Sequence, residues 1–226
     1  MFLEQNIKGI CEKFGLDFEE FLDELDAENV KELTVFDLEA IAEEYELDVH
    51  ALIFKPCFHV AEVRAKLDHL KLLVLDVDGV MTDGGMYFAE SGDQFKKFNT
   101  KDGMAILHLT KSDFQVAIIS SGFRDKAVKA RAEMLGIQHC VVTREPKINV
   151  LKEICEELEI KLDQVAIIGD DINDQEIMRN VGVSFCPSDA VDTVKEFVDV
   201  VLSKKGGHGC VREAIDQYIL KQPLSR

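Results

Sequence analysis

Six short apolar runs that alternate with helical stretches constrain the fold of residues 69–226 more than any other feature of this sequence. The runs are rich in valine and isoleucine and are apolar nearly throughout, as strands covered on both faces must be. Strands and helices that alternate in this way form right-handed crossovers and a parallel sheet. We therefore predict an α/β domain with strands at 71–77, 115–120, 139–142, 165–169, 182–185 and 198–202 and helices at 102–112, 124–136, 147–159, 173–181, 189–197 and 209–220.

One segment departs from the alternation. Residues 84–99 have the pattern of two strands around the turn Glu90-Ser91-Gly92-Asp93. Such a pattern predicts a hairpin, and we expect it to protrude from the main sheet.

Residues 1–60 have a different character. Their apolar residues recur at helical spacing, Thr34 and Asp37 resemble a capping box, and breaks are expected at Gly15 and at 48–50. The segment holds four lysines against sixteen acidic residues, so it carries −12 of the net charge of −17. We predict a small all-α N-terminal module over 1–60, a connector at 56–68 and a separate domain over 69–226.

Composition narrows the range of partners. A net charge of −17 opposes binding to nucleic acid or to an acidic membrane surface, and no apolar stretch approaches the roughly 20 residues of a membrane span. The acidic start is unlike a signal peptide, and six scattered cysteines indicate reduced thiols rather than disulfides or a zinc site. We expect a cytoplasmic protein with neither a nucleic-acid nor a membrane partner.

Two aspartates follow the first apolar run directly. Asp76 and Asp78 are two residues apart, so in an extended chain they project together from the carboxyl end of the strand. Open α/β sheets bind their ligands at that end. Gly79 then lets the backbone turn sharply. Taken alone, the segment is explained equally well by a strand that ends in a polar turn.

A second acidic cluster removes most of that ambiguity. Gly169, Asp170 and Asp171 end the run at 165–169, and Asp174 lies on the helix that follows. Alone, they could be the acidic first turn of a helix. Carboxylates gathered at two parallel strand ends repel one another unless a hard cation lies between them, and Mg²⁺ prefers oxygen ligands. The two clusters together predict a magnesium site.

The remaining strand ends carry hydroxyl, amide and ammonium groups. Ser120, Ser121 and Gly122 follow the run at 115–120 and offer a cradle for phosphate. Lys147 opens the helix before the second acidic run, where it could neutralise a phosphate oxygen and restrain Asp76. Helix capping by serine and an ordinary surface lysine are the competing interpretations.

The order Asp-x-Asp-Gly, Ser, Lys, Gly-Asp-Asp-x-x-Asp resembles the haloacid-dehalogenase superfamily of phosphohydrolases over residues 69–220. The resemblance implies a Rossmann-like fold, with a mostly parallel sheet, flanking helices and the hairpin. It also implies that Asp76 attacks phosphorus to form an aspartyl phosphate. Asp78 would give a proton to the leaving alkoxide and then take one from the hydrolytic water.

The resemblance further implies a magnesium ion held by the Asp76 carboxylate, the Asp78 backbone carbonyl and the Asp170 carboxylate. Other side chains would hold the remaining phosphate oxygens or support the metal ligands from outside, directly or through water. These supporting residues are Ser120, Lys147, Asp171 and Asp174.

A narrower resemblance concerns the substrate. Only the hairpin separates Asp78 from the first helix, so we expect no cap domain. The segments 82–88, 96–106 and 206–213 are similar to the 3-deoxy-D-manno-octulosonate 8-phosphate phosphatases of lipopolysaccharide synthesis. They are equally similar to sialic-acid-pathway relatives, which act on nine-carbon sugar acid phosphates or form the tail of acylneuraminate cytidylyltransferases. In that group the hairpins assemble a homotetramer, and the glycine-rich tail reaches a neighbour's active site.

By the same resemblance, Thr100, Lys101, Asp102 and Arg212 are expected to contact the substrate. A 2-keto acid carries a carboxylate, which a guanidinium binds in a two-pronged fashion. The competing interpretation is that Arg212 and Glu213 only cap and solubilise the last helix.

Two departures bear on specificity. The loop SSGFRDK is one residue longer than the usual Thr-Gly-Arg type, so Ser120 and Ser121 are both candidates for the phosphate. Phe123, in the same loop, matches neither the eight-carbon nor the nine-carbon pattern. His208 stands where the tail often has arginine.

Residues 33–54 resemble the last helices of a repressor-type helix-turn-helix domain. A DNA-reading helix needs lysine and arginine to meet phosphates, and this segment has almost none. We interpret residues 1–60 as a degenerate module for protein contacts or oligomer packing.

The sequence thus predicts a Mg²⁺-dependent phosphomonoester hydrolase that acts on 3-deoxy-D-manno-octulosonate 8-phosphate, a small sugar acid phosphate. One alternative is the nine-carbon acid as substrate. Another is a non-catalytic regulator that senses a phosphosugar and signals through the N-terminal helices, and a third is an interaction scaffold built on an inactive enzyme. The intact Asp76 and Asp78 pair favours the enzyme.

Overall fold

The computed structural model of the chain describes residues 2–45, 47–54, 63, 66–91, 94–122 and 124–220. These residues divide into two compact units, Met1–Arg64 and Ala65–Arg226, which are described separately. Most of the predicted connector at 56–68, and the whole of Phe123, lie outside the described residues.

The first unit is helical in its described part. Its helices enclose a core that includes Ile7, Ile10 and Leu52, and the capping box predicted at Thr34 is confirmed. The break predicted at 48–50 is wrong in one respect, because the Asp48 carboxylate accepts a hydrogen bond from the Ala51 N–H (2.9 Å) and a further helix begins there. The helices are α1 Leu3–Phe14, α2 Phe18–Asp23, α3 Val35–Glu44 and α4 Val49–Phe54.

A six-stranded sheet with the order β5-β4-β1-β6-β7-β8 forms the centre of the second unit. Every neighbouring pair is parallel, as predicted, and Leu75 of β1 is in register with Ile118 of β4 and Ile168 of β6. The two acidic motifs therefore end adjacent strands. The strands are β1 Leu72–Leu75, β4 Gln115–Ser121, β5 His139–Thr143, β6 Val165–Ile168, β7 Val183–Cys186 and β8 Val200–Val201.

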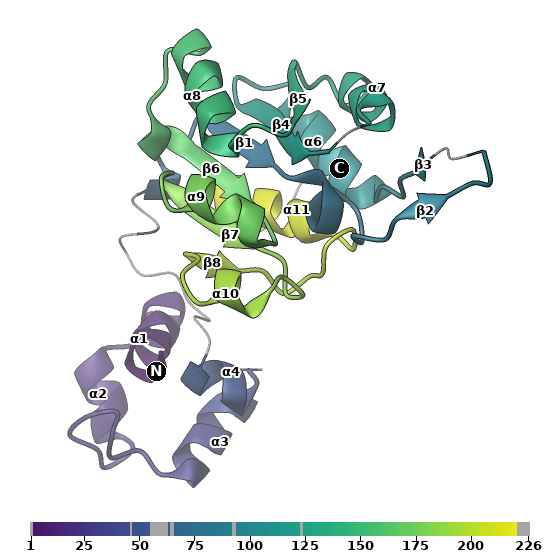
Figure 1. The fold of residues 1–226 in the computed structure, drawn as a ribbon. Helices are drawn as coiled ribbons and strands as arrows, with labels where there is room; N and C mark the ends of the chain where they lie inside the picture. The colour runs from purple at the N-terminus through teal and green to yellow at the C-terminus, as the bar shows by residue number, and fades with distance from the viewer. Residues whose placement is uncertain are drawn as a thin grey trace. The chain divides into compact units, whose positions relative to one another are not determined.

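Helices lie on both faces of this sheet (Figure 1). One face, with Leu72, Val74 and Ile119, packs against buried residues of α8, α9 and α10, and α6 contacts β4 and α11. The helices are α6 Thr100–Leu109, α7 Lys126–Met134, α8 Lys147–Glu157, α9 Gln175–Met178, α10 Asp192–Lys195 and α11 Cys210–Ala214, with short helical turns η1 Val77–Met81, η2 Leu162–Gln164, η3 Ile172–Asp174 and η4 Ile215–Ile219.

The predicted hairpin is present and extends away from the sheet (Figure 1). Its strands, β2 Tyr87–Phe88 and β3 Gln94–Phe95, pair antiparallel. Part of its turn, residues 92 and 93, lies outside the described residues. Apolar side chains of both strands are exposed, which is unusual for such large groups.

Within the described ranges, no helix has the length and apolar character needed to cross a membrane. The cysteines described there, at 11, 140, 155, 186 and 210, are free thiols.

Candidate active site

The residues after β1 carry the first two aspartates. Asp76 stays extended (φ −74°, ψ 165°), and its N–H donates to a carbonyl of β6 at 3.1 Å. The chain then turns through η1, where Gly79 has a φ of +85°, in the left-handed region that favours glycine. Asp76 is buried and Asp78 is half-exposed. Both line one cavity of about 210 Å³.

The second acidic cluster lies beside the first because β6 pairs with β1. Asp174 is fully buried, and its Oδ2 accepts a hydrogen bond from the Asp170 N–H at 3.1 Å, which fixes the backbone that presents Asp170 to the cavity. Asp171 also lines the cavity, while its Oδ1 accepts from the Ile172 N–H at 2.7 Å and caps its own turn.

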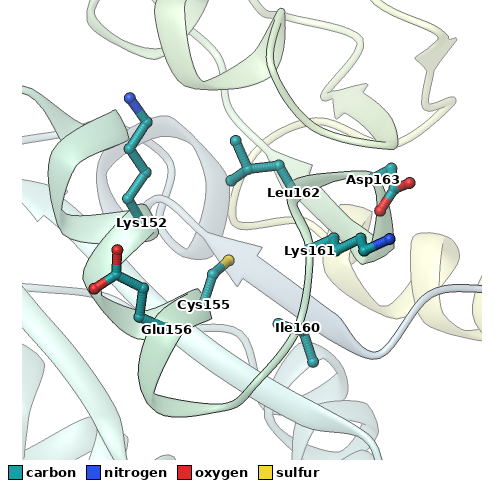
Figure 2. Close-up of a pocket in the computed structure, with 7 residues that line it drawn as sticks. All are labelled: Lys152, Cys155, Glu156, Ile160, Lys161, Leu162 and Asp163. Atoms are coloured by element: carbon teal, nitrogen blue, oxygen red, sulfur yellow. The ribbon is translucent and has the colours of Figure 1, made fainter.

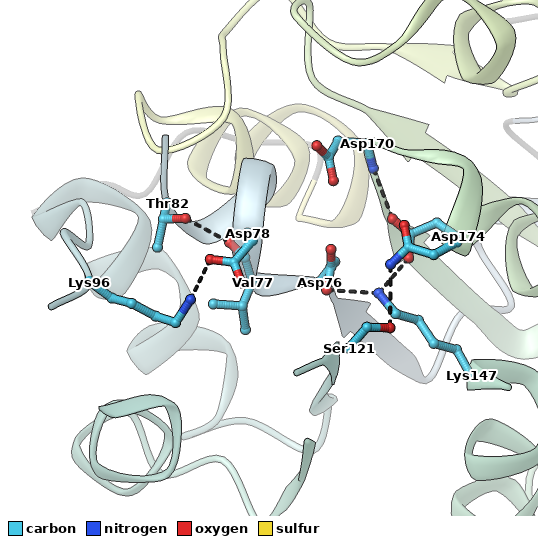
Figure 3. Close-up of polar contacts among 10 residues, drawn as sticks. Asp76, Val77, Asp78, Thr82, Lys96, Ser121, Lys147, Asp170 and Asp174 are labelled. Atoms are coloured by element: carbon cyan, nitrogen blue, oxygen red, sulfur yellow. Dashed lines mark hydrogen bonds and ion pairs between the residues drawn. The ribbon is translucent and has the colours of Figure 1, made fainter. Parts of the chain in front are cut away.

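Lys147 links the two clusters. It is the first residue of α8 and is buried, so the interpretation as a surface lysine is wrong. Its Nζ lies 2.8 Å from Asp76 Oδ1 and 2.6 Å from Asp174 Oδ1 (Figure 3). A buried ammonium with two carboxylate partners holds both in fixed positions.

The arrangement fits a divalent cation. One oxygen each from Asp76, Asp170 and Asp174 lie within 4.8 Å of one another. Asp76 Oδ1 is buried and, within the described part of the chain, accepts no hydrogen bond of good geometry despite its ion pair with Lys147. Such an unsatisfied oxygen in a carboxylate cluster suits Mg²⁺. Both oxygens of Asp174 are engaged, one by Lys147 and one by the Asp170 N–H, whereas Asp76 pairs with Lys147 through Oδ1 only. Asp76 and Asp170 are therefore the carboxylates that could hold the metal.

Gly79 makes room for the Asp170 carboxylate. A Cβ atom at residue 79 would lie 1.9 Å from Asp170 Oδ2, which no side chain could tolerate. The turn after Asp78 thus needs glycine both for its φ angle and for this close approach.

Burial and mutual repulsion raise the pKa values of the carboxyl groups. Burial and then the Asp174 charge raise the pKa of Asp76, against the opposing effect of Lys147. Burial, followed by the charges of Asp76 and Asp174, raises the pKa of Asp170 to about 8. Burial tends to lower the pKa of Lys147, but its two carboxylate partners outweigh that effect and raise it. The lysine therefore stays charged, and a divalent cation would relieve the remaining repulsion.

The predicted phosphate cradle lies at the end of β4. Ser120 is buried and Ser121 is exposed, and both line the same cavity as Asp76. Ser121 Oγ accepts a hydrogen bond from Asn173 Nδ2 at 3.3 Å, and Asn173 was not among the predicted site residues. The Gly122 N–H is directed to the Thr143 carbonyl of β5, at 3.4 Å.

The structure does not gather the predicted substrate contacts of α6 and α11 at the cavity. Thr100 and Lys101 are exposed at the start of α6, outside its lining. Asp102 is buried, and its Oδ1 accepts from the Arg212 N–H at 2.7 Å. Arg212 Nε donates to Asp216 at 2.5 Å. Within one chain Asp102 has no surface for a substrate, and we assign it to capping the start of α11.

The glycine-rich tail, residues 206–209, contacts its own chain, and its approach to a neighbour's active site, which the resemblance implies, stays a prediction. The Gly207 N–H donates to the Val80 carbonyl at 2.9 Å, and Asn99 Nδ2 donates to the Gly207 carbonyl at 3.0 Å. A Cβ atom on Gly206 would lie 1.9 Å from the Gly79 carbonyl oxygen. The tail thus packs directly on the η1 turn that carries Asp78.

Lys96 was not predicted and reaches the site from the hairpin. It follows β3, and its Nζ donates a hydrogen bond to Asp78 Oδ1 (Figure 3). The sequence offers no clear signal for it, because adjacent lysines at the edge of a hairpin usually face solvent.

A larger cavity, of about 450 Å³, opens beside α8 (Figure 2). It is lined by Lys152 and Cys155 of that helix and by residues 160–163, which precede β6. It therefore lies at the amino end of the strand, away from the carboxylates, and open α/β sheets bind ligands at the opposite end.

Comparison with known proteins agrees with this geometry. Residues 145–214 match the model of the haloacid dehalogenase-like hydrolases. The chain is 39% identical over 162 residues to the 3-deoxy-D-manno-octulosonate 8-phosphate phosphatase KdsC of Escherichia coli K12, covering 72% of this chain and 86% of the relative.

Solved structures of 3-deoxy-D-manno-octulosonate 8-phosphate phosphatases have a similar fold. A crystal structure of 3-deoxy-D-manno-octulosonate 8-phosphate phosphatase from Yersinia pestis superposes with a TM-score of 0.69 at 39% identity, covering 72% of this chain and 87% of that one. The Moraxella catarrhalis phosphatase of the same name, solved with magnesium, phosphate and KDO, has a TM-score of 0.69 at 32% identity, covering 73% of this chain and 94% of that one.

Proposed function

Because this chain belongs to the haloacid dehalogenase-like hydrolases, among the relatives of the 3-deoxy-D-manno-octulosonate 8-phosphate phosphatases, we propose that it hydrolyses that eight-carbon sugar acid phosphate with Mg²⁺. The observation that carries the proposal is the position of Asp76. This carboxylate is buried at the cavity wall, held by Lys147 and close to Asp170. Asp78 lines the same cavity two residues further on.

The reaction follows from these positions. A carboxylate oxygen of Asp76 attacks phosphorus, and the bond from phosphorus to the sugar oxygen breaks. Asp78 gives its proton to that oxygen as it leaves. Water then attacks the phosphorus of the aspartyl phosphate, Asp78 takes a proton from it, and Asp76 and inorganic phosphate are released.

The Asp76 carboxylate, the Asp78 backbone carbonyl and the Asp170 carboxylate would hold Mg²⁺, which would neutralise charge on the transferring phosphoryl group. Asp174 would not bind the metal itself. It orients Asp170 through the backbone N–H and shares Lys147 with Asp76. Asp171 is proposed to support the site from the cavity rim.

Strand alternation favours Ser121 over Ser120 for the phosphate. In β4, Ala117 and Ile119 face the same cluster as Leu72 and Val74 of β1, and alternation places residue 121 on that face. Asp76 extends the same face of β1, which α8 covers and where Lys147 begins. Ser121 and Lys147 would thus hold phosphoryl oxygens on either side of Asp76.

The names of the relatives support a sugar acid phosphate as substrate. Access to the cavity is consistent with this, because between η1 and α6 the chain contributes a hairpin and no cap domain. We propose that Arg212, Thr100 and Lys101 meet the substrate only in an assembly, since they do not line the cavity of one chain. A homotetramer formed through the hairpins, in the cytoplasm, is part of the proposal.

The test is phosphate release with Mg²⁺ from 3-deoxy-D-manno-octulosonate 8-phosphate and from the nine-carbon analogue, by the natural chain and by Asp76→Asn. We expect release from the eight-carbon acid by the natural chain and none by the variant. Preference for the nine-carbon acid phosphate would instead assign the enzyme to a sialic-acid-like pathway. Absence of release from both acids would refute the substrate class.

A further inference from the structure

A lysine from the hairpin contacts the side chain proposed as the acid and base. Lys96 lies directly after β3, and its Nζ donates a hydrogen bond to Asp78 Oδ1 (Figure 3). The Lys96 side chain is 15% exposed although it belongs to a protruding hairpin, and the Asp78 side chain is 44% exposed. The lysine therefore extends inward, over the more open carboxylate.

This contact is the main restraint on the Asp78 side chain. In the described part of the chain, its carboxylate has no other hydrogen-bond or ion-pair partner. The backbone at Asp78 is extended (φ −80°, ψ 119°) within the η1 turn. A half-exposed carboxylate without a partner samples several rotamers, and acid catalysis needs one of them.

The neighbouring lysine provides a contrast. Lys97 is 65% exposed, and its Nζ lies 3.2 Å from Asp83 Oδ2, outside the lining of the catalytic cavity. Two adjacent residues of the same type thus differ in burial and in partner. Only Lys96 is directed to the reacting groups.

We infer that Lys96 is a positioning residue that holds the Asp78 carboxylate toward the leaving-group oxygen. The inference rests on the proposed function, because it assigns a role within the aspartyl-phosphate reaction. In the first step the bond from phosphorus to the sugar oxygen breaks, and the Asp78 proton moves to that oxygen. Lys96 does not exchange a proton in this step. It fixes where Asp78 lies when the transfer occurs.

The role predicts a dependence on the leaving group. A sugar alkoxide leaves only with a proton, so misplacement of Asp78 slows its departure. The p-nitrophenolate ion is stable without a proton, so the aryl phosphate is insensitive to the position of Asp78 in that step. A residue that bound the phosphoryl group, or that only stabilised the fold, would affect both substrates alike.

The experiment compares the natural chain with Lys96→Gln, Lys96→Arg and Lys97→Gln. For each, kcat and KM are measured with saturating Mg²⁺ on 3-deoxy-D-manno-octulosonate 8-phosphate and on p-nitrophenyl phosphate, together with the thermal midpoint. Because positioned acid–base groups contribute about 10²–10⁴-fold, we expect Lys96→Gln to lower kcat for the sugar phosphate at least about 10-fold. Its KM should be unchanged. The two substrates are compared by kcat/KM, which includes no step after the leaving group departs and so excludes the later proton transfer from water to Asp78, and kcat/KM for the aryl phosphate should fall less than about 3-fold.

Lys96→Arg retains a cation and is expected to restore most of the lost rate, and Lys97→Gln should match the natural chain on both substrates. Equal losses on both substrates, a change confined to KM, or no loss with Lys96→Gln would each overturn the inference. If Lys96→Gln fails to fold, Lys96→Ala carries the same comparison: a loss confined to the sugar phosphate supports the role, and an equal loss on both substrates, or no loss, refutes it. A natural chain inactive on both substrates would instead refute the proposed function and this role with it.

Discussion

At the residue scale, the proposed chemistry depends on three buried groups that meet beside the carboxyl ends of β1 and β6, Lys147 reaching them from the start of α8. Asp76 and Asp174 share the Lys147 ammonium at 2.8 and 2.6 Å. A buried ion pair contributes little net stability, but the loss of one partner leaves uncompensated charge in a medium of low polarity. The triad is therefore sensitive to single substitutions.

Lys147→Met should destabilise the metal-free protein by about 3–5 kcal/mol at pH 8, the usual cost of breaking a buried ion pair. The loss should be smaller at pH 5, because the carboxyl group of Asp76, which pairs with Lys147 and has its pKa raised by burial to about 7, then holds a proton. Urea unfolding at the two pH values measures both free energies. Lys152→Met, on the same helix, is the control, and an equal effect of the two variants would contradict the account.

The contribution of Asp170 to the stability of the metal-free protein should fall as pH rises. The pKa of Asp170 is about 8 in the folded chain against an ordinary value of 3.8, so the folded state binds more protons between these values. The contribution of Asp170 to stability is fully present below pH 3.8 and is lost as pH rises through about 8.

The pH dependence that Asp170 contributes is measured by comparing thermal midpoints of the natural chain and of Asp170→Asn in EDTA, from pH 4 to pH 8.5. The natural chain should lose stability relative to the variant over that range. Added Mg²⁺ should restore more stability at pH 8 than at pH 6, because it binds the deprotonated carboxylates. A constant difference between the two proteins across the range would refute the assignment.

Most residues that line the cavity were predictable, because strand ends concentrate function in α/β sheets. Asp76, Asp78, Ser120, Ser121 and Asp170 all line it. Lys96 and Asn173 were not predicted, because each reaches the site through a side-chain contact that no local pattern encodes. The capping role of Asp102 likewise depends on a contact with a residue 110 positions away.

At the scale of elements, the alternation of apolar runs with helical stretches predicted the sheet and its helices. The residues at which individual elements begin and end were less predictable. The helix predicted at 209–220 is divided into α11 and η4, and that at 173–181 into η3 and α9. The helix α4 lies within the segment 33–54 that resembles the last helices of a helix-turn-helix domain, and Asp48, which accepts a hydrogen bond from the Ala51 N–H, precedes its first residue next to the predicted break. The contact of the glycine-rich tail with η1 joins segments far apart in the sequence, so it could not be predicted without the structure.

That contact predicts the effect of Gly206→Ala. The new Cβ would lie 1.9 Å from the Gly79 carbonyl oxygen, so the tail or the η1 turn must move. We expect a stability loss of about 1–3 kcal/mol, as for other overpacked sites, and a clear fall in kcat because η1 carries Asp78. Gly15→Ala, in the N-terminal unit, adds a Cβ that meets open space but at a φ of +71°, so it should cost some stability while leaving kcat unchanged. Full activity in Gly206→Ala would contradict the proposed role of the tail.

At the scale of the whole molecule, two units of different character share one chain. The role of the acidic helical unit in protein contacts stays a prediction. The catalytic unit exposes large apolar groups on its hairpin, among them Met86, Tyr87, Phe88 and Phe95. Exposed groups of this size at a protruding element indicate a surface that another molecule covers, and the proposed homotetramer would cover it.

Phe88→Glu should therefore dissociate the assembly without unfolding the chain. Phe88 is 60% exposed in the single chain, so a charge there costs the isolated chain little, but it would be buried at an interface between copies. Light scattering during size-exclusion chromatography gives the mass. Met134→Glu, at a 71% exposed position of α7 in the same unit as the hairpin, is the control, and an unchanged mass for Phe88→Glu would refute assembly through the hairpin.

The central claim is that Asp76 carries the phosphoryl group during turnover. The most direct measurement is an acid quench of the enzyme with Mg²⁺ and 3-deoxy-D-manno-octulosonate 8-phosphate in the steady state, followed by borohydride reduction and peptide mass spectrometry. Reduction of an aspartyl phosphate yields homoserine at the modified position. We predict homoserine at position 76 and at no other aspartate of the site. Turnover without any modification, or modification of Asp78 or Asp170 instead, would contradict the account.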